Sequence, residues 1–255
     1  MLERLYRQYQ RRDFVHPDPL EFLYGYDNPA DREIVGFVAA SLAYGRVRQI
    51  VKSISTVLAP MGSSPSCYVE HTTKRMLRRT FRNFRHRFST GGELVELLVG
   101  IRRVRGIYGS LHACMMHHLR ESDDTVVPAL ARMTEELRGG RSSPCNSLLP
   151  LPAAGSACKR LNLYLRWMVR RDGVDVGDWA DIPSSKLVVP LDTHMHRISI
   201  GLGFTKRTQA DMKTVIEVTA AFRDIAPADP VRYDFVLTRP GIWKHAGING
   251  MSRRA

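Results

Sequence analysis

The chain has 255 residues, 44% of them apolar, and its formal net charge at pH 7 is +13. This length and apolar fraction are enough for one large domain or two small ones with a proper core, and they exclude a disordered chain. Most of the 38 basic residues are arginine. Because a guanidinium group grips phosphate with two hydrogen bonds, a nucleic acid is the leading expected partner, and a membrane surface is the alternative.

The cysteine spacing gives no support for a zinc or iron–sulfur site, because none of the four cysteines forms a C-x-x-C pair. The first four residues, Met-Leu-Glu-Arg, open a charged amphipathic segment and do not resemble a secretory leader. No window approaches 18 uninterrupted apolar residues. We therefore expect an intracellular, cytoplasmic protein with no cofactor, no membrane span and no obligate protein partner.

Helical spacing of apolar residues recurs along the first half of the chain. It predicts helices over residues 1–12, 31–42 and 47–58, and a short helix capped by Asp18. Residues 74–88 hold seven lysines and arginines and three phenylalanines, which predicts a helix with one aromatic face and one basic face. The basic face is either simply solvated or lies on phosphates. A further helix begins at Gly91, and residues 102–120 continue basic and helical.

The second half predicts helices over residues 128–137, 157–169, 192–200, 208–222 and 230–237. Thr208 and Asp229 are the expected caps of the last two. The tail, residues 241–255, is expected to fray. Almost no segment alternates apolar and polar residues, so we expect an all-α protein.

Lys159 falls in the first turn of the helix predicted over 157–169, where a cation opposes the helix dipole. That position disfavours the ammonium form and makes a free amine more available as a nucleophile. The alternative is an ordinary surface lysine.

Asp192 follows the apolar run Leu187–Leu191 and stands where it can cap the next helix. A carboxylate held by helix amides also suits the stabilisation of a developing cation. Asp192 and His196, at i and i+4, are additionally compatible with a metal site, although His194 points away and two ligands are too few alone.

The segment Val189–Ile198 resembles the V-D-T-H signature of the helix-hairpin-helix DNA glycosylase superfamily, typified by endonuclease III. The run from Lys159 to Leu165 resembles that superfamily's Lys-Thr-Ala-Asn-x-x-Leu run. As a whole, the chain is similar to the DUF2400 family. The resemblance implies that Lys159 is the nucleophile and Asp192 the catalytic aspartate.

The resemblance also implies a fold of two helical lobes with a cleft between them. The lobes are expected over residues 30–145 and over residues 1–29 plus 146–240 of a single glycosylase-like unit. Tyr44 or Arg46 is expected as the wedge that enters the duplex, and Trp167 or Trp179 as a stacking surface for the flipped base. Further nucleic-acid contacts are assigned to Arg160, His194, His196 and Arg197.

Three departures from the superfamily pattern stand out. The hairpin normally reads L-P-G-x-G, whereas residues 151–155 read Leu-Pro-Ala-Ala-Gly. The gap from Lys159 to Asp192 is longer than in endonuclease III and is similar to that of archaeal 8-oxoguanine glycosylases. The C-terminal four-cysteine motif is missing, so no iron–sulfur cluster is implied.

The implied activity is base excision with strand cleavage, acting on double-stranded DNA with a damaged base. The expected lesion is an oxidised purine such as 8-oxoguanine. Two alternatives stay open. One is a DNA- or RNA-binding module on the same fold without catalysis. The other is a metal-dependent nucleic-acid hydrolase that uses Asp192 and His196.

Overall fold

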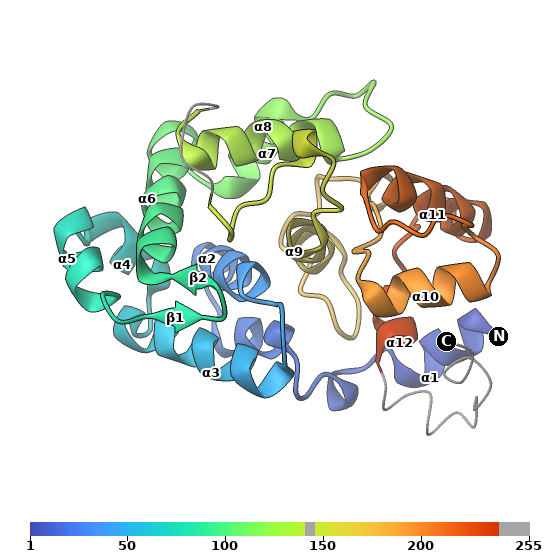
Figure 1. The fold of residues 1–255 in the computed structure, drawn as a ribbon, viewed down its shortest axis with the longest axis horizontal. Helices are drawn as coiled ribbons and strands as arrows, with labels where there is room; N and C mark the ends of the chain where they lie inside the picture. The colour runs from blue at the N-terminus through green and yellow to red at the C-terminus, as the bar shows by residue number, and fades with distance from the viewer. Residues whose placement is uncertain (141–145, 240–255) are drawn as a thin grey trace. The chain divides into compact units, whose positions relative to one another are not determined.

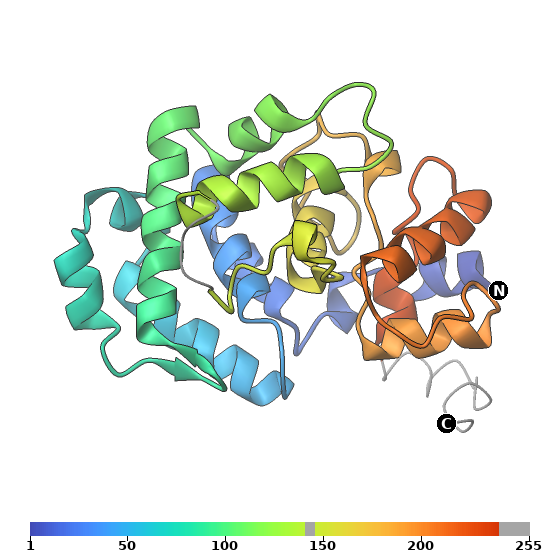
Figure 2. The same cartoon turned by 45° about the horizontal axis from the view of Figure 1, so that its top comes forward.

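The computed structural model describes residues 1–140 and 146–239, and Figures 1 and 2 show its helices and strands from two directions. The chain divides into two compact units. Unit 2 is Pro17–Ala154, and unit 1 combines Met1–His16 with the chain from Gly155 onward. The boundaries expected from the sequence lie after residues 29 and 145.

Unit 2 is built around α2 (Pro29–Ser41), which is buried over nearly its whole length, and α6 (Gly91–Tyr108), which packs against four other helices. The remaining elements are η2 (Pro19–Gly25), α3 (Val47–Leu58), η3 (Ala59–Met61), α4 (Pro65–His71), α5 (Lys74–Thr80), β1 (Arg85–His86), β2 (Ser89–Thr90), α7 (Leu111–His118), α8 (Val127–Arg138) and η4 (Pro152–Ala154).

Two buried carboxylates on α2 tie its start to neighbouring helices. Asp31 accepts hydrogen bonds from the backbone and hydroxyl of Ser66, at 2.8 and 2.6 Å, in the first turn of α4. Glu33 accepts from the backbone N–H groups of Leu111 and His112, at 3.0 and 2.9 Å, and so satisfies the amino end of α7. These bonds explain how two acidic residues are tolerated in the core.

The prediction of a single helix over residues 74–88 is wrong. Helix α5 ends at Thr80, and β1 and β2 then pair as an antiparallel hairpin, with Arg85 opposite Thr90. Thr90 starts α6 through a capping box with Glu93, and Gly91 lies so close to Phe81 that an added Cβ would come within 1.9 Å of the Phe81 carbonyl oxygen. The chain must therefore turn back before residue 91, and the phenylalanines do not share one face.

Unit 1 consists of α1 (Leu2–Tyr9), η1 (Arg12–Phe14), α9 (Lys159–Val169), η5 (Ser184–Lys186), α10 (Thr193–Gly201), α11 (Met212–Ile225) and α12 (Asp234–Thr238). Its core contains α9, from which eight of eleven residues are buried. The apolar run Leu187–Leu191 is also buried, and it is anchored to α11 by the Val189 N–H group, which donates to the Thr219 hydroxyl at 3.0 Å.

Several predicted boundaries need correction. A single helix does not continue through residues 102–120, because Gly109 adopts a φ of +86° and Ser110 caps the new helix α7. Helix α11 starts at Met212 under an Asp211 cap, not under Thr208. Helix α12 starts at Asp234, and Asp229 does not cap it because its carboxylate binds Arg170 instead.

The described residues are mostly helical, and the hairpin is the only sheet among them, which confirms the predicted helical class. Across the described ranges, every helix is too short or too polar to cross a membrane. The tail expected to fray, residues 241–255, lies outside the described residues.

Candidate active site

Lys159 is the first residue of α9, and its position is set by the segment before it. Cys158 has a left-handed backbone, with φ +45° and ψ +37°, which turns the chain sharply into the helix. Upstream, the Gly155 carbonyl accepts from the Met212 N–H group at 3.0 Å, and Ser156 bridges to Asp211. The start of α9 is thus held against the start of α11, and the Lys159 side chain is half-buried.

The residues that correspond to the expected hairpin form one turn of 3-10 helix, Pro152–Ala154, followed by Gly155 with a φ of +78°. Glycine takes this conformation without steric cost. The single glycine retained from the hairpin pattern therefore stands at the position that requires one.

Asp192 caps α10, as its sequence position predicts. Its Oδ1 atom accepts from the backbone N–H groups of His194 and Met195, at 2.9 and 2.8 Å. The buried run before it and the two hydrogen bonds after it fix the plane of the carboxylate. Asp192 is half-buried, so it is supported by the core while one side remains accessible.

The other polar residues of α10 have different environments. His194 and Arg197 are exposed. His196 is buried, and its Nε2 lies 2.9 Å from the Arg207 carbonyl oxygen. Because a carbonyl oxygen only accepts, this nitrogen carries a hydrogen. Among the described residues, no three histidine, cysteine or acidic side chains are grouped in a way that could hold a metal ion.

Sequence reasoning missed Asp234, the first residue of α12, which packs against α10. Its Oδ2 atom accepts from Arg166 Nη1, whereas its Oδ1 atom is buried without a hydrogen-bond partner. Burial raises the pKa of Asp234; the charge of Arg166 opposes this rise, that of Asp192 adds to it and that of Lys159 opposes it. Lys159 and Asp192 therefore both lie within electrostatic range of one buried carboxylate.

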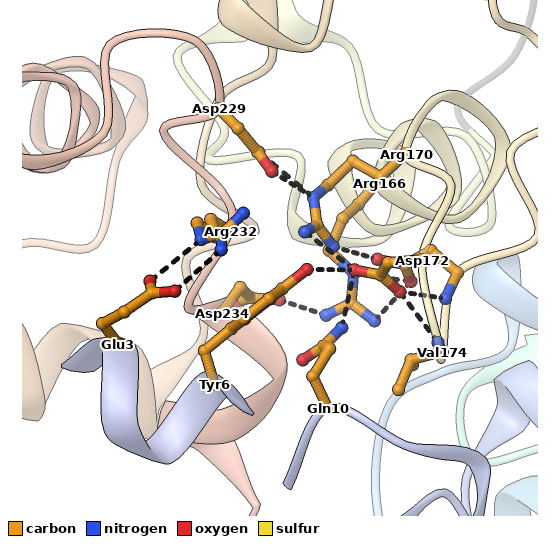
Figure 3. Close-up of polar contacts among 11 residues, drawn as sticks. Glu3, Tyr6, Gln10, Arg166, Arg170, Asp172, Val174, Asp229, Arg232 and Asp234 are labelled. Carbon is orange, nitrogen blue, oxygen red and sulfur yellow. Dashed lines mark hydrogen bonds and ion pairs between the residues drawn. The ribbon is translucent and has the colours of Figure 1, made fainter. Parts of the chain in front are cut away.

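Asp234 belongs to a larger buried network of alternating charges (Figure 3). Arg166 binds Asp175 through Nε and Nη2, at 3.2 and 3.1 Å, as well as Asp234. Arg170 binds Asp175, and also Asp172 and Asp229 at 2.9 Å each. Both arginines are only 3% exposed. The network therefore spaces two guanidinium groups among four carboxylates.

The pKa values of the network follow from burial and neighbouring charges. Burial raises the pKa of Asp175 to about 6 against the pull of Arg166 and Arg170, so this carboxyl is still ionised at neutral pH. For Asp172, burial works in the raising direction but is outweighed by Arg170 and by the backbone N–H groups of Asp175 and Val174, so its pKa is lowered.

Helix α1 closes this network from the amino-terminal end of the chain (Figure 3). The Tyr6 hydroxyl and the Gln10 amide each donate to Asp172 Oδ2 at 3.0 Å. Glu3 pairs with Arg232, with 3.1 Å between Oε1 and Nη2. The first ten residues thus hold the segments on which Asp172 and Asp234 lie.

The remaining predicted site residues are dispersed. Arg160 is half-buried in the first turn of α9, beside Lys159 in sequence. Trp167 and Trp179 are 0% and 2% exposed and present no open ring face, so their contact with a flipped base stays a prediction. Tyr44 and Arg46 belong to unit 2, where Tyr44 is half-buried and Arg46 is exposed.

Comparison with known proteins identifies a family for the chain. No curated protein and no solved structure shows significant similarity to it. A family model described as a protein of unknown function, DUF2400, matches residues 18–243, which include Lys159, Asp192 and Asp234. The chain belongs to the DUF2400 family.

Proposed function

We propose that the protein is a DNA glycosylase with lyase activity, in which Lys159 is the nucleophile and Asp192 the supporting carboxylate. The observation that carries the proposal is the packing of the three helices that carry these residues: Lys159 begins α9, Asp192 caps α10, and α12 packs against α10 while its Asp234 binds Arg166 of α9. The charges of Lys159 and Asp192 accordingly both influence the pKa of the buried Asp234 carboxyl. A lysine and two carboxylates in one electrostatic neighbourhood are the groups that amine-based excision of a base needs.

The reaction begins with the free amine of Lys159. Its nitrogen lone pair forms a bond to the sugar C1′ atom as the bond from C1′ to the base nitrogen breaks, and the base leaves with that bonding pair and takes up a proton. Loss of the amine protons and opening of the sugar ring convert the adduct into a Schiff base. Removal of a C2′ proton then expels the 3′ phosphate, which cleaves the strand by β-elimination.

Asp192 supports the positive charge that develops on the sugar. Its Oδ1 atom is committed to two backbone N–H groups, and these fix its direction. Asp234 is assigned a positioning role: its salt bridge with Arg166 connects the start of α12 to α9, and α12 packs against α10, so it holds together the helices that carry Lys159 and Asp192. The substrate class that fits the resemblance to DNA glycosylases is an oxidised purine such as 8-oxoguanine.

Borohydride trapping tests the proposal. Full-length protein is mixed, in the presence of EDTA, with labelled duplexes that contain 8-oxoguanine, uracil, thymine glycol or an abasic site. We expect a covalent protein–DNA band that is lost in Lys159→Gln and reduced at least tenfold in Asp192→Asn. Lys213→Gln, an exposed lysine of the same unit, is the matched control and keeps the band.

The outcomes separate the alternative functions. DNA binding without a covalent band on any duplex overturns the lyase mechanism and leaves a binding module on the same fold. Strand cleavage that requires a divalent metal and stops in EDTA indicates the metal-dependent hydrolase instead. A band with the abasic duplex alone supports the lysine chemistry and shows that the excised base is none of those tested.

A further inference from the structure

The hairpin of unit 2 carries the most exposed aromatic side chain near the basic stretch. Arg87 and Phe88 form its two-residue turn between β1 and β2. Arg87 has a φ of +54°, a left-handed conformation that is costly for a residue with a Cβ atom. Phe88 is 61% exposed. A strained turn that displays a phenylalanine to solvent calls for a functional explanation.

Phe88 lies on a supporting ring. Tyr44, in the loop between α2 and α3, stacks on it with 5.0 Å between ring centroids and 30° between ring planes. Tyr44 covers one face of the Phe88 ring, and the large exposed fraction leaves the other face open to solvent. The pair is therefore a two-ring stack with one free end.

The supporting ring is itself fixed from three sides. The Tyr44 hydroxyl donates to the His86 carbonyl at 2.9 Å and lies 2.6 Å from the Ser89 hydroxyl. The buried ring of His86 meets Tyr44 edge-on at 4.5 Å, and its Nε2 donates to the Tyr44 carbonyl at 3.0 Å. Its Nδ1 faces the Ser53 hydroxyl on α3, at 2.8 Å. The platform is thus rigid before any ligand arrives, which lowers the entropy lost on binding.

Exposed arginines lie on the elements that build this platform and on the link that leads to it. The Arg87 side chain lies against Gly45, where an added Cβ would come within 2.8 Å of Arg87 Cδ. Strand β1 packs on α3, which Arg46 precedes as the N-cap. Five guanidinium groups on these elements and on the link from α5 are exposed, and none forms a hydrogen bond or an ion pair within residues 1–140 and 146–239: Arg46, Arg48, Arg82, Arg85 and Arg87.

We infer that the Phe88–Tyr44 pair is a stacking platform for an unpaired nucleobase, with the surrounding arginines binding the phosphates on either side of that base. The inference rests on the proposed function for its partner, DNA. A base has a flat π face that matches the open face of Phe88, and such stacking contributes about 1–3 kcal/mol per base. A membrane surface fits less well, because guanidinium groups outnumber apolar side chains here and bind phosphates in a fork geometry.

The platform also revises the expected wedge. Tyr44 was assigned that role on sequence position, but its hydroxyl is engaged and its ring lies beneath Phe88. In the inferred arrangement Phe88 contacts the base and Tyr44 supports it.

Fluorescence anisotropy tests the inference with two labelled duplexes. One has a single base unpaired opposite a tetrahydrofuran spacer, and the other is fully paired. We expect Phe88→Ala to weaken binding of the first duplex about 5- to 160-fold, the range that loss of one stacked base gives. Binding of the paired duplex changes less than about twofold. Phe88→Trp retains the affinity, because the larger ring stacks as well.

Two further variants separate stacking from folding and from charge. Ile107→Ala removes a side chain of unit 2 that is equally exposed, 61%, and leaves both affinities unchanged. Phe88→Ala leaves the slope of log affinity against log salt unchanged, whereas Arg87→Gln lowers its magnitude by about 0.9, the value for one phosphate contact.

Equal losses on both duplexes, or none on the unpaired-base duplex, overturn the inference. So does Phe88-dependent binding to anionic vesicles with DNA affinity unaffected. The spacer lacks the C1′ group that forms a Schiff base, so this assay is independent of lysine chemistry. If binding depends on Phe88 but borohydride traps no covalent complex, the platform is supported and the lyase activity is rejected. If borohydride traps the complex but Phe88→Ala binds both duplexes like the wild type, the lyase activity is supported and the platform is rejected.

Discussion

Arginine serves opposite purposes in the two units. In unit 1, Arg166 and Arg170 are buried and each binds two or more carboxylates. In unit 2, the arginines around the hairpin are exposed and have no acidic partner within the described ranges. The local supply of acidic residues explains the difference: Asp172 and Asp175 follow α9 closely, whereas residues 74–88 contain no aspartate or glutamate. Burial of Arg166 and Arg170 is possible because carboxylates supply both the opposite charge and the hydrogen-bond acceptors, whereas the exposed arginines of the hairpin stay available to an anionic ligand.

Disrupting the buried charge network of unit 1 should have the largest effect on stability. Arg166→Gln leaves Asp175 and Asp234 without their shared cation, so we expect the free energy of unfolding to fall by about 3–5 kcal/mol. Arg171→Gln, at an exposed neighbouring position, is the control and changes it by less than about 0.5 kcal/mol. Urea unfolding followed by circular dichroism measures both. Equal midpoints for the two variants would contradict a structural role of the network.

The pH dependence of stability provides a second test of the buried network, through the titration of Asp175. Its pKa is raised from 3.8 to about 6 by burial, so the folded chain binds this proton more tightly than the unfolded chain. The resulting stabilisation is present below about pH 4 and is lost as pH rises through about 6, with a magnitude of roughly 3 kcal/mol. Without this group, the free energy of unfolding of Asp175→Asn should fall less than that of the wild type as pH rises from about 4 to 6.

Asp172, in the same network, should contribute to the pH dependence of stability with the opposite sign. Its pKa is lowered, so its contribution is present at neutral pH and is lost only as pH falls through that lowered value, below the window in which Asp175 titrates. Asp172→Asn should therefore change the slope between pH 4 and 6 much less than Asp175→Asn does, and only because the charge of Asp172 helps to raise the pKa of Asp175. A slope in Asp175→Asn identical to that of the wild type would show that this carboxyl does not titrate there.

A moderate effect is expected at the hairpin. Tyr44→Phe removes the hydroxyl that holds His86 and Ser89 but keeps the ring under Phe88. We expect unit 2 to lose about 1 kcal/mol of stability, the net value of a typical hydrogen bond, and to keep its affinity for the unpaired-base duplex within about threefold. Tyr68→Phe is the control, because the Tyr68 hydroxyl forms no hydrogen bond within the described ranges. A loss as large as that of Phe88→Ala would place the base contact on Tyr44.

The smallest effect on stability is expected among the exposed arginines. Arg82→Gln should change the free energy of unfolding by less than about 0.5 kcal/mol, since its side chain is exposed and unpaired among the residues described. The same variant should lower the magnitude of the salt slope of DNA binding by about 0.9 if Arg82 neutralises one phosphate. An unchanged slope would remove Arg82 from the contact surface.

The features that local rules govern could be predicted from the sequence. The helix over 47–58 and the caps at Asp18 and Asp192 depend on neighbouring residues, and all three are confirmed. The prediction of a helix over residues 74–88 was wrong because the three phenylalanines have helical spacing although the segment contains a two-residue turn. Its correction was available in the pattern Thr90-x-x-Glu93, which marks a new helix start.

The rest depends on contacts between distant residues. Asp234 pairs with a residue 68 positions earlier, and no spacing rule connects the two. The sequence signal was an aspartate within an otherwise aromatic and apolar run, Tyr233 to Leu237. The same limit explains the wrong prediction that Asp229 caps a helix. No neighbouring residue indicated that Arg170 would bind its carboxylate.

The closure of unit 1 by α1 has a consequence for biosynthesis. Glu3 contacts Arg232 across 229 positions, so α1 must wait while the intervening chain is made, which takes on the order of ten to fifty seconds at about 5–20 residues per second. Residues 17–154 form a continuous unit that emerges complete within that interval. Vectorial synthesis therefore favours an order in which unit 2 folds first and the amino-terminal helix docks last.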